Sequence, residues 1–167
     1  MSEIELVPFG HKMKSKGVYN MEELYVEMQL WFVHMGYTWR EVEYKKIGFP
    51  GGGYRMEIIW IGDKAVDDYT SFQIKLVLAA DISDVEVVLD GGKKVKRQKA
   101  GIEIRSGASL FRNDGYFKDS IFNTGTLQKN VYEYLIRGRL RQQETDLWVE
   151  AHKLYDELKA FMLIYPH

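Results

Sequence analysis

The chain has 167 residues, a length typical of one domain, and its contents of 46% hydrophobic and 28% charged residues are close to globular averages. With 23 basic and 24 acidic residues its formal charge is -1, so nucleic acid or anionic lipid could be recognised only through a local patch of charge. The absence of cysteine excludes disulfides, cysteine-ligated metals and thiol catalysis.

The amino terminus lacks the basic and apolar regions of a secretory signal, and no apolar run approaches the roughly 20 residues that span a bilayer. We therefore expect a cytoplasmic protein without a membrane span, folded as a single domain over residues 1–167. No segment carries a metal-binding or cofactor motif, and none is expected to bind either.

The first segment, residues 3–16, predicts a short strand around Ile4 and Leu6 followed by a lysine-containing loop. A helix is predicted next. Asn20 with Glu23 resembles a capping box, and Gly36 supplies a C-terminal stop. Between them, apolar residues recur at helical spacing at Met21, Leu24, Tyr25, Met28, Trp31, Phe32 and Met35.

The middle of the chain, residues 38–111, predicts a succession of strands. Residues 38–47 are so heavily charged that they fit an edge strand, with Glu41 and Glu43 projecting from the same side. A strand over residues 54–61 is followed by a predicted turn at residues 62–64. The clearest alternation then places Phe72, Ile74, Leu76, Leu78 and Ala80 on one buried face.

A protruding hairpin is predicted around Asp90-Gly91-Gly92, because Asp-Gly between extended runs is a strong hairpin signal. Residues 112–115 predict a further turn, and Ile121 and Phe122 are expected to anchor the segment that follows it.

Helical sequence then dominates, with Thr126 and Thr145 as candidate caps and an end at Pro166; whether it forms one helix or two is open. Its apolar seam of Leu147, Leu154, Leu158 and Phe161 is predicted to pack on the sheet, with pairing to a second subunit as the alternative.

This order of elements predicts an α+β fold: a single antiparallel sheet of about five to six strands, packed against the N-terminal amphipathic helix and a long C-terminal helical region. The arrangement resembles that of helix-grip ligand-binding domains, although no motif of such a family is present. A fold of this kind does not by itself assign a function.

Two basic clusters are the strongest local signal of function. They comprise Lys93, Lys94, Lys96, Arg97 and Lys99 on the predicted hairpin, and Arg137, Arg139 and Arg141 in the helical region. If they converge on one surface, they could bind phosphates. The leading hypothesis is a self-associating, non-enzymatic binding or scaffold protein that presents these clusters to nucleic acid or to an acidic protein surface. Ordinary surface charge remains the competing interpretation.

The alternative hypothesis is a small-molecule pocket between the sheet and the C-terminal helix, lined by Trp60, Phe72, Tyr155 and Met162 and gated by the glycine-rich loop at residues 49–54. An enzyme is the third hypothesis and the least favoured. The four histidines have no partners at ligand spacing, and the aspartates cluster where turns are predicted.

Overall fold

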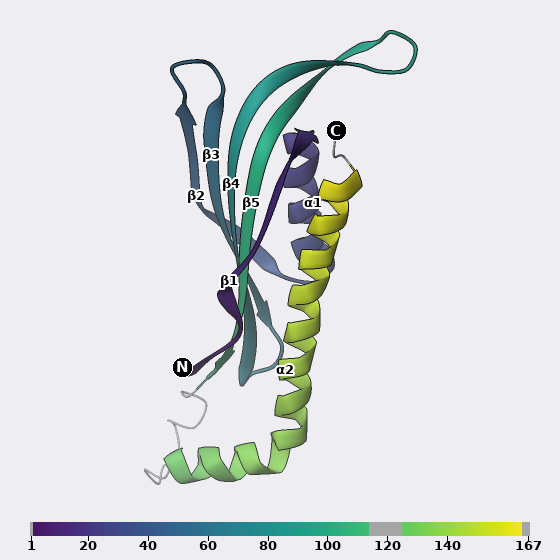
Figure 1. Cartoon of the computed structure of the whole chain (residues 1–167). Coiled ribbons are helices and arrows are strands. Elements are labelled where there is room, and N and C mark those ends of the chain that lie inside the picture. Colours follow the sequence, from purple (N-terminus) through teal and green to yellow (C-terminus); the bar gives the residue numbers. More distant parts are fainter. Residues whose placement is uncertain (1, 114–124, 165–167) are drawn as a thin grey trace.

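A computed structural model describes residues 2–113 and 125–164 of the chain (Figure 1). Within these ranges it does not describe the side chains at positions 10, 11, 86, 87, 96, 125 and 164. Within these ranges the elements follow in the order β1 (Ser2–Tyr19), α1 (Met21–His34), β2 (Thr38–Gly48), β3 (Tyr54–Ala65), β4 (Thr70–Val88), β5 (Lys94–Arg112) and α2 (Gly125–Ile164).

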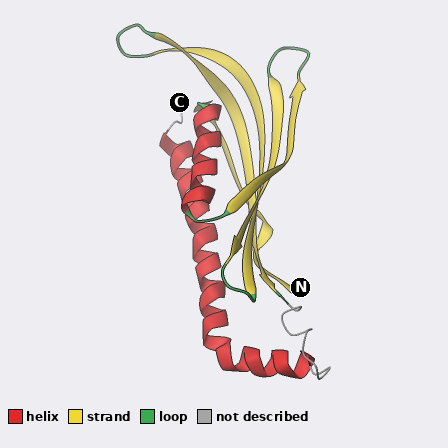
Figure 2. Ribbon diagram, turned by 180° about the vertical axis from the view of Figure 1, so that it is seen from behind, coloured by secondary structure: helices red, strands yellow, loops and turns green. Residues whose placement is uncertain are grey.

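The five strands form one antiparallel sheet in the order β1-β5-β4-β3-β2. Both helices lie on the same face of it, and the other face is left open (Figure 2). The predicted α+β class with a single antiparallel sheet is therefore confirmed, as is the position of residues 38–47 at an edge. The second edge is β1, which pairs with β5 rather than with a neighbour in sequence.

The core lies between the sheet and the helices. The alternation predicted in β4 is confirmed, because its five inward side chains, from Phe72 to Ala80, are all at most 3% exposed. Burial of each larger apolar side chain contributes roughly 1.5–3 kcal/mol. Trp60 of β3 and Phe32 of α1 are fully buried beside them and lie edge to face, with ring centroids 6.3 Å apart.

Helix α1 begins and ends as predicted. The Asn20 side chain accepts hydrogen bonds from the backbone amides of Glu22 and Glu23, which satisfies two free donors of the first turn. At the other end Gly36 adopts a φ of 78°, and the Tyr37 amide donates to the Phe32 carbonyl. This is the hydrogen-bond pattern of a Schellman cap, which needs a left-handed residue.

The predicted turn at residues 62–64 is wrong, because β3 continues through Gly62 to Ala65 and the chain turns at residues 66–69. Gly62 has a packing role instead. A Cβ atom at this position would lie 2.4 Å from a ring carbon of Phe32. The glycine therefore provides the space in which α1 packs closely on the sheet.

The hairpin between β4 and β5 protrudes as predicted. Pairing of β1 with β5 stops at Tyr19, and pairing of β3 with β4 stops at Tyr54, so residues 83–99 beyond these points pair mainly with each other. Figure 1 shows this hairpin extending past the rest of the sheet.

The helical region is a single helix, α2, which bends sharply near its N-terminal end (Figure 1). The question left open by the sequence is therefore answered by one bent helix. Thr145 is not a cap, since its hydroxyl donates to the Arg141 carbonyl within the helix. The seam of Leu147, Leu154 and Leu158 is at most 3% exposed and packs into the core. Among the described side chains of α2, Leu140 is the first that is buried. The preceding residues 125–138, which we call the arm, run across the end of the sheet (Figure 1).

Polar contacts fasten α2 to the sheet beyond the arm. The Asp67 carboxylate accepts hydrogen bonds from the amides of Tyr69 and Thr70 in its own turn, and from Gln143 and Arg139 of α2 at 2.6 Å each. These donors hold the pKa of Asp67 below its ordinary value, although partial burial opposes the shift.

Three predictions lie outside the described residues: the turn beyond Asn113, the anchoring by Ile121 and Phe122, and the helix end at Pro166. In the part of the chain that the structure describes, neither helix is long and apolar enough to cross a membrane.

Candidate binding face

The open face of the sheet carries the largest hollow that we describe. Side chains directly opposite each other in an antiparallel pair point to the same face, so the register places one row of residues across all five strands. This row consists of Lys14, Glu103, Ala79, Glu57 and Lys45. Four charged side chains therefore flank Ala79 on the face opposite the two described helices.

Strand β1 contributes a row of lysines to this face, and the predicted loop in this segment is wrong. Met13 is buried against the helices, opposite Ile104, whereas Lys12, Lys14 and Lys16 fall on the open face. The strand is 18 residues long because it pairs along β5 on both sides of a break in register.

That break brings an aromatic ring onto the open face. The register of β1 shifts between Val7 and His11, and Phe9 lies over Gly107 of β5, where an added Cβ would approach it to 3.0 Å. Phe9 is 40% exposed, and the Lys75 ammonium lies 4.8 Å from the centroid of its ring. A β-bulge thus places an accessible ring beside the hollow.

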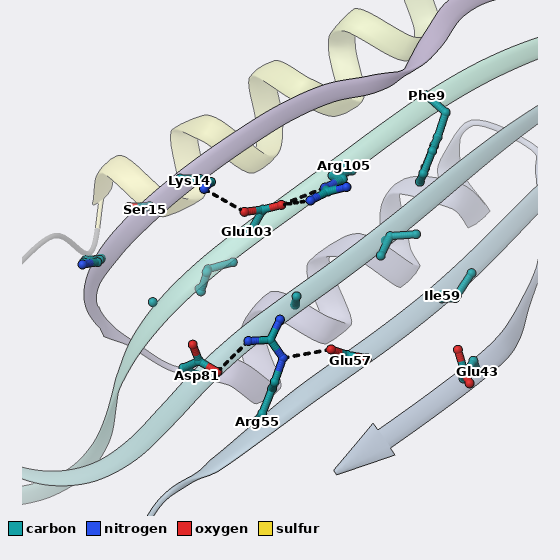
Figure 3. Close-up of a pocket in the computed structure, with 15 residues that line it drawn as sticks. Phe9, Lys14, Ser15, Glu43, Arg55, Glu57, Ile59, Asp81, Glu103 and Arg105 are labelled. Carbon is teal, nitrogen blue, oxygen red and sulfur yellow. Dashed lines mark hydrogen bonds and ion pairs between the residues drawn. The ribbon is translucent and has the colours of Figure 1, made fainter. Parts of the chain in front are cut away.

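The hollow has a volume of about 460 Å³, within the range of small-molecule sites. Ile59, Val77 and Ala79 form its apolar floor, and Figure 3 shows charged side chains around it. Two ion-pair groups border it. Glu103 binds Lys14 at 3.1 Å and Arg105 at 2.6 Å.

The second group is centred on Arg55, which binds Glu57 at 2.8 Å and Asp81 at 3.2 Å (Figure 3). On strand β2, Glu43 also borders the hollow and pairs with Lys45. The β1–β5 side of the hollow is therefore mainly basic, whereas the β2–β3 side carries more acidic residues.

The ion pairs shift the titration of their members. Hydrogen bonds from Arg105 and Lys14 lower the pKa of Glu103 to about 2. Hydrogen bonding to Glu57 and the charge of Asp81 raise the pKa of Arg55. Both groups are thus fully charged at neutral pH, which favours binding of a charged partner over proton transfer.

Part of the predicted hairpin cluster continues the basic side of the hollow. The buried residues of this part of β5 have even numbers, whereas Arg97 and Lys99 have odd numbers, as Glu103 and Arg105 do. Because side chains alternate along a strand, Arg97 and Lys99 lie on the open face with them. We call this set the basic strip; it comprises Lys12, Lys14, Lys16, Arg97, Lys99 and Arg105, with Glu103 as the carboxylate inside it.

The other predicted hairpin residues are placed differently. Lys93 and Lys94 are exposed at the tip, and the side chain of Lys96 lies outside the described part of the chain. The alternation of β5 points Lys94 away from the face that carries Arg97 and Lys99. The hairpin cluster is therefore divided between the two faces of the strand.

The helical cluster lies elsewhere, because the part of α2 that carries it is at the opposite end of the molecule from the hairpin (Figure 1). Arg137 and Arg141 line a hollow of about 400 Å³ together with Arg112, whose guanidinium binds Glu144 at 2.9 Å. Arg139 binds Asp67 instead. The two predicted basic clusters do not converge on one surface.

The residues of the alternative pocket belong to the packed interior. Trp60, Phe72 and Met162 are at most 4% exposed within one hydrophobic cluster, and Tyr155 packs against it. None of them lines the two hollows described above. The loop at residues 49–54 closes the β2–β3 hairpin.

The predicted common side for Glu41 and Glu43 is wrong. A register shift between them turns Glu43 to the open face, whereas Glu41 accepts hydrogen bonds from Tyr25 and from the Trp60 indole on the helix side, at 3.0 Å each. Among the described residues, no group of three or more His, Asp or Glu side chains could hold a metal ion.

Comparisons with known proteins give no relative, because no protein family, no curated protein and no solved structure matches this chain. A function for the candidate site is therefore inferred from the geometry and charge of its residues alone.

Sequence reasoning missed the three lysines of β1, although a signal for them was present. In His11-Lys-Met-Lys-Ser-Lys16 the lysines occupy every second position around one apolar residue. This is the period of a strand with one basic face and one buried face.

Proposed function

We propose that the protein is a non-enzymatic binding protein that holds single-stranded nucleic acid along the open face of its sheet. The observation that carries this proposal is the basic strip, in which six cationic side chains from two neighbouring strands lie together on one face around Glu103. The other carboxylates that these two strands turn to this face, Glu3 and Glu5, lie beyond Phe9 at the far end of β1. On a chain of net charge -1, such a local concentration is what recognition of a polyanion requires.

The surroundings of the strip favour a single strand over a duplex. Nonspecific single-strand binding combines a positive groove for the phosphates with apolar or aromatic surfaces for the bases. Here the floor of Ile59 and Val77 lies beside the strip, and the exposed Phe9 ring lies next to it. A flat basic surface without this floor would offer less to unpaired bases.

The test compares two double variants with the same change in charge. Lys12→Ala/Lys16→Ala removes two cations of the strip without breaking the Lys14–Glu103 ion pair. Lys153→Ala/Lys159→Ala removes two exposed lysines of α2 and serves as the control. Binding of a labelled single-stranded oligonucleotide is measured by fluorescence anisotropy across a salt series, with a duplex of the same sequence in parallel.

We expect the wild-type protein to bind the single strand at low salt and to lose affinity as salt rises. Because each phosphate contact contributes about 0.7 to the logarithmic salt slope for single strands, the strip variant should reduce this slope by about 1.4. The control variant should leave it unchanged. Absence of binding at low salt, or an equal loss of affinity in both variants, would refute the proposal. Polyglutamate serves as an acidic polymer without bases, and a protein that binds it but not the oligonucleotide would refute the proposal as well.

A second candidate is a small molecule bound in the same hollow, which its volume of about 460 Å³ and its oppositely charged sides favour. A zwitterionic ligand with an apolar centre would match those sides. Native mass spectrometry of the purified protein distinguishes the two candidates, because a retained small molecule adds a discrete mass to that of the protein. The substitution Val77→Trp fills the floor of the hollow, so this added mass should be absent from the variant.

A further inference from the structure

The arm of α2 presents an apolar stripe to solvent. Leu127, Val131, Tyr134 and Leu135 follow the spacing i, i+4, i+7, i+8 and therefore lie on one side of the helix. They are 52–74% exposed, with Leu135 the most exposed of the four. A helix on the surface of a monomer normally turns such a stripe inward, so this one indicates an interface.

The flank of this stripe is basic. Arg137 lies 4.9 Å from the centre of the Tyr134 ring, and Arg141 follows one turn later; both line the hollow beside Tyr134. A partner for the arm should therefore combine an apolar stripe with negative charge.

Helix α1 of the same chain carries that combination on its outer face. Its inner side is buried through Leu24 and Met28, whereas Val26, Leu30 and Val33 on the opposite side are 42–55% exposed at the spacing i, i+4, i+7. Three exposed glutamates surround this outer stripe: Glu22, Glu23 and Glu27. Within one molecule the two surfaces are separate, because the arm lies at the other end of α2 from α1 (Figure 1).

We propose that the protein forms a homodimer in which the arm of each chain packs on the outer face of α1 of the other. A two-fold axis lets each chain give one arm and receive one, so both apolar stripes are covered at once. The seven side chains of the two stripes expose on the order of 700 Å² per chain, against roughly 800 Å² per partner in a standard interface. These surfaces are separate from the basic strip, so this proposal and the proposed function can fail independently.

The experiment measures the oligomeric state of the full chain by sedimentation velocity across a concentration series. Leu135→Glu places a carboxylate on the arm, and Leu30→Glu places one on α1. Leu89→Glu at the hairpin tip is the matched control, since Leu89 and Leu30 are 43% and 42% exposed. Circular dichroism and thermal unfolding check that each variant is folded.

We expect the wild-type protein and Leu89→Glu to dimerise alike, and Leu135→Glu and Leu30→Glu each to raise the dimer dissociation constant at least about tenfold, as loss of a hot spot does. An equimolar mixture of the two defective variants should dimerise more tightly than either alone, because one intact arm then meets one intact α1.

Three results would overturn the proposal. One is a wild-type chain that stays monomeric at every concentration. Another is a dimer that Leu135→Glu leaves intact. The third is a dimer that Leu135→Glu disrupts while Leu30→Glu does not, which would show that the arm contacts a surface other than α1.

Discussion

Substitution of Gly62 by alanine tests the closest contact between α1 and the sheet. The added methyl would lie 2.4 and 2.5 Å from two ring carbons of Phe32. That ring is fully buried and packs against Trp31, Tyr37 and Trp60, so it has little room to move. Overpacking of this kind costs typically 1–3 kcal/mol.

Alanine also restricts the unfolded chain, which favours folding by about 0.4–1 kcal/mol. The net expectation for Gly62→Ala is a loss of about 1–2 kcal/mol, which lowers Tm by about 2–8 °C in a chain of this size. Urea unfolding followed by circular dichroism measures the free energy directly.

Gly48→Ala is the control for this substitution, because it also adds a methyl to a strand but meets no atom within 4 Å. It should be neutral or slightly stabilising. Phe32→Leu should cost less stability in the Gly62→Ala background than in the wild-type protein, since the smaller side chain relieves the clash. If Gly62→Ala is as stable as the wild type, the inferred close packing of α1 on β3 is incorrect.

Two further predictions concern the polar contacts. Because the pKa of Glu103 is lowered from 4.5 to about 2 in the folded state, its ion pairs contribute stability above about pH 4.5, and this is lost as pH falls towards 2. Glu103→Gln should therefore flatten the fall in unfolding free energy over this range, and an unchanged slope would contradict the assignment. Asp67→Ala should cost about 2–3 kcal/mol in urea unfolding, because it leaves donors from the turn and from α2 without their acceptor. The exposed Asp68→Ala should change stability by less than about 0.5 kcal/mol, and equal effects of the two substitutions would contradict the role of Asp67.

The elements that sequence reasoning predicted correctly are those set by local periodicity and capping. The alternation from Phe72 to Ala80 required a strand with one buried face, and Asn20 with Gly36 bounded a helix whose apolar residues recur at helical spacing. The protruding hairpin followed from Asp90-Gly91-Gly92, because the turn chemistry lies within those residues.

Two of the errors share a physical cause, which is contact between residues distant in sequence. Residues 11–16 lack enough apolar side chains to predict a strand alone, yet β5 supplies hydrogen-bond partners along most of β1. The turn predicted at Gly62 came from a residue that usually breaks strands, but here the glycine accommodates Phe32 from another element. Neither partner could be identified from the local sequence.

The amino-acid sequence by itself determined the class of fold, the buried face of the central strand and the two caps of α1, because these depend on side-chain spacing within a single segment. Only the tertiary structure decided which cations share a surface. Arg97 and Lys99 join the β1 lysines because β1 and β5 are hydrogen-bonded neighbours, whereas Arg139 is neutralised by Asp67 from a distant turn. Charge acts through space, and the distances between these groups are set by strand pairing that no single segment encodes.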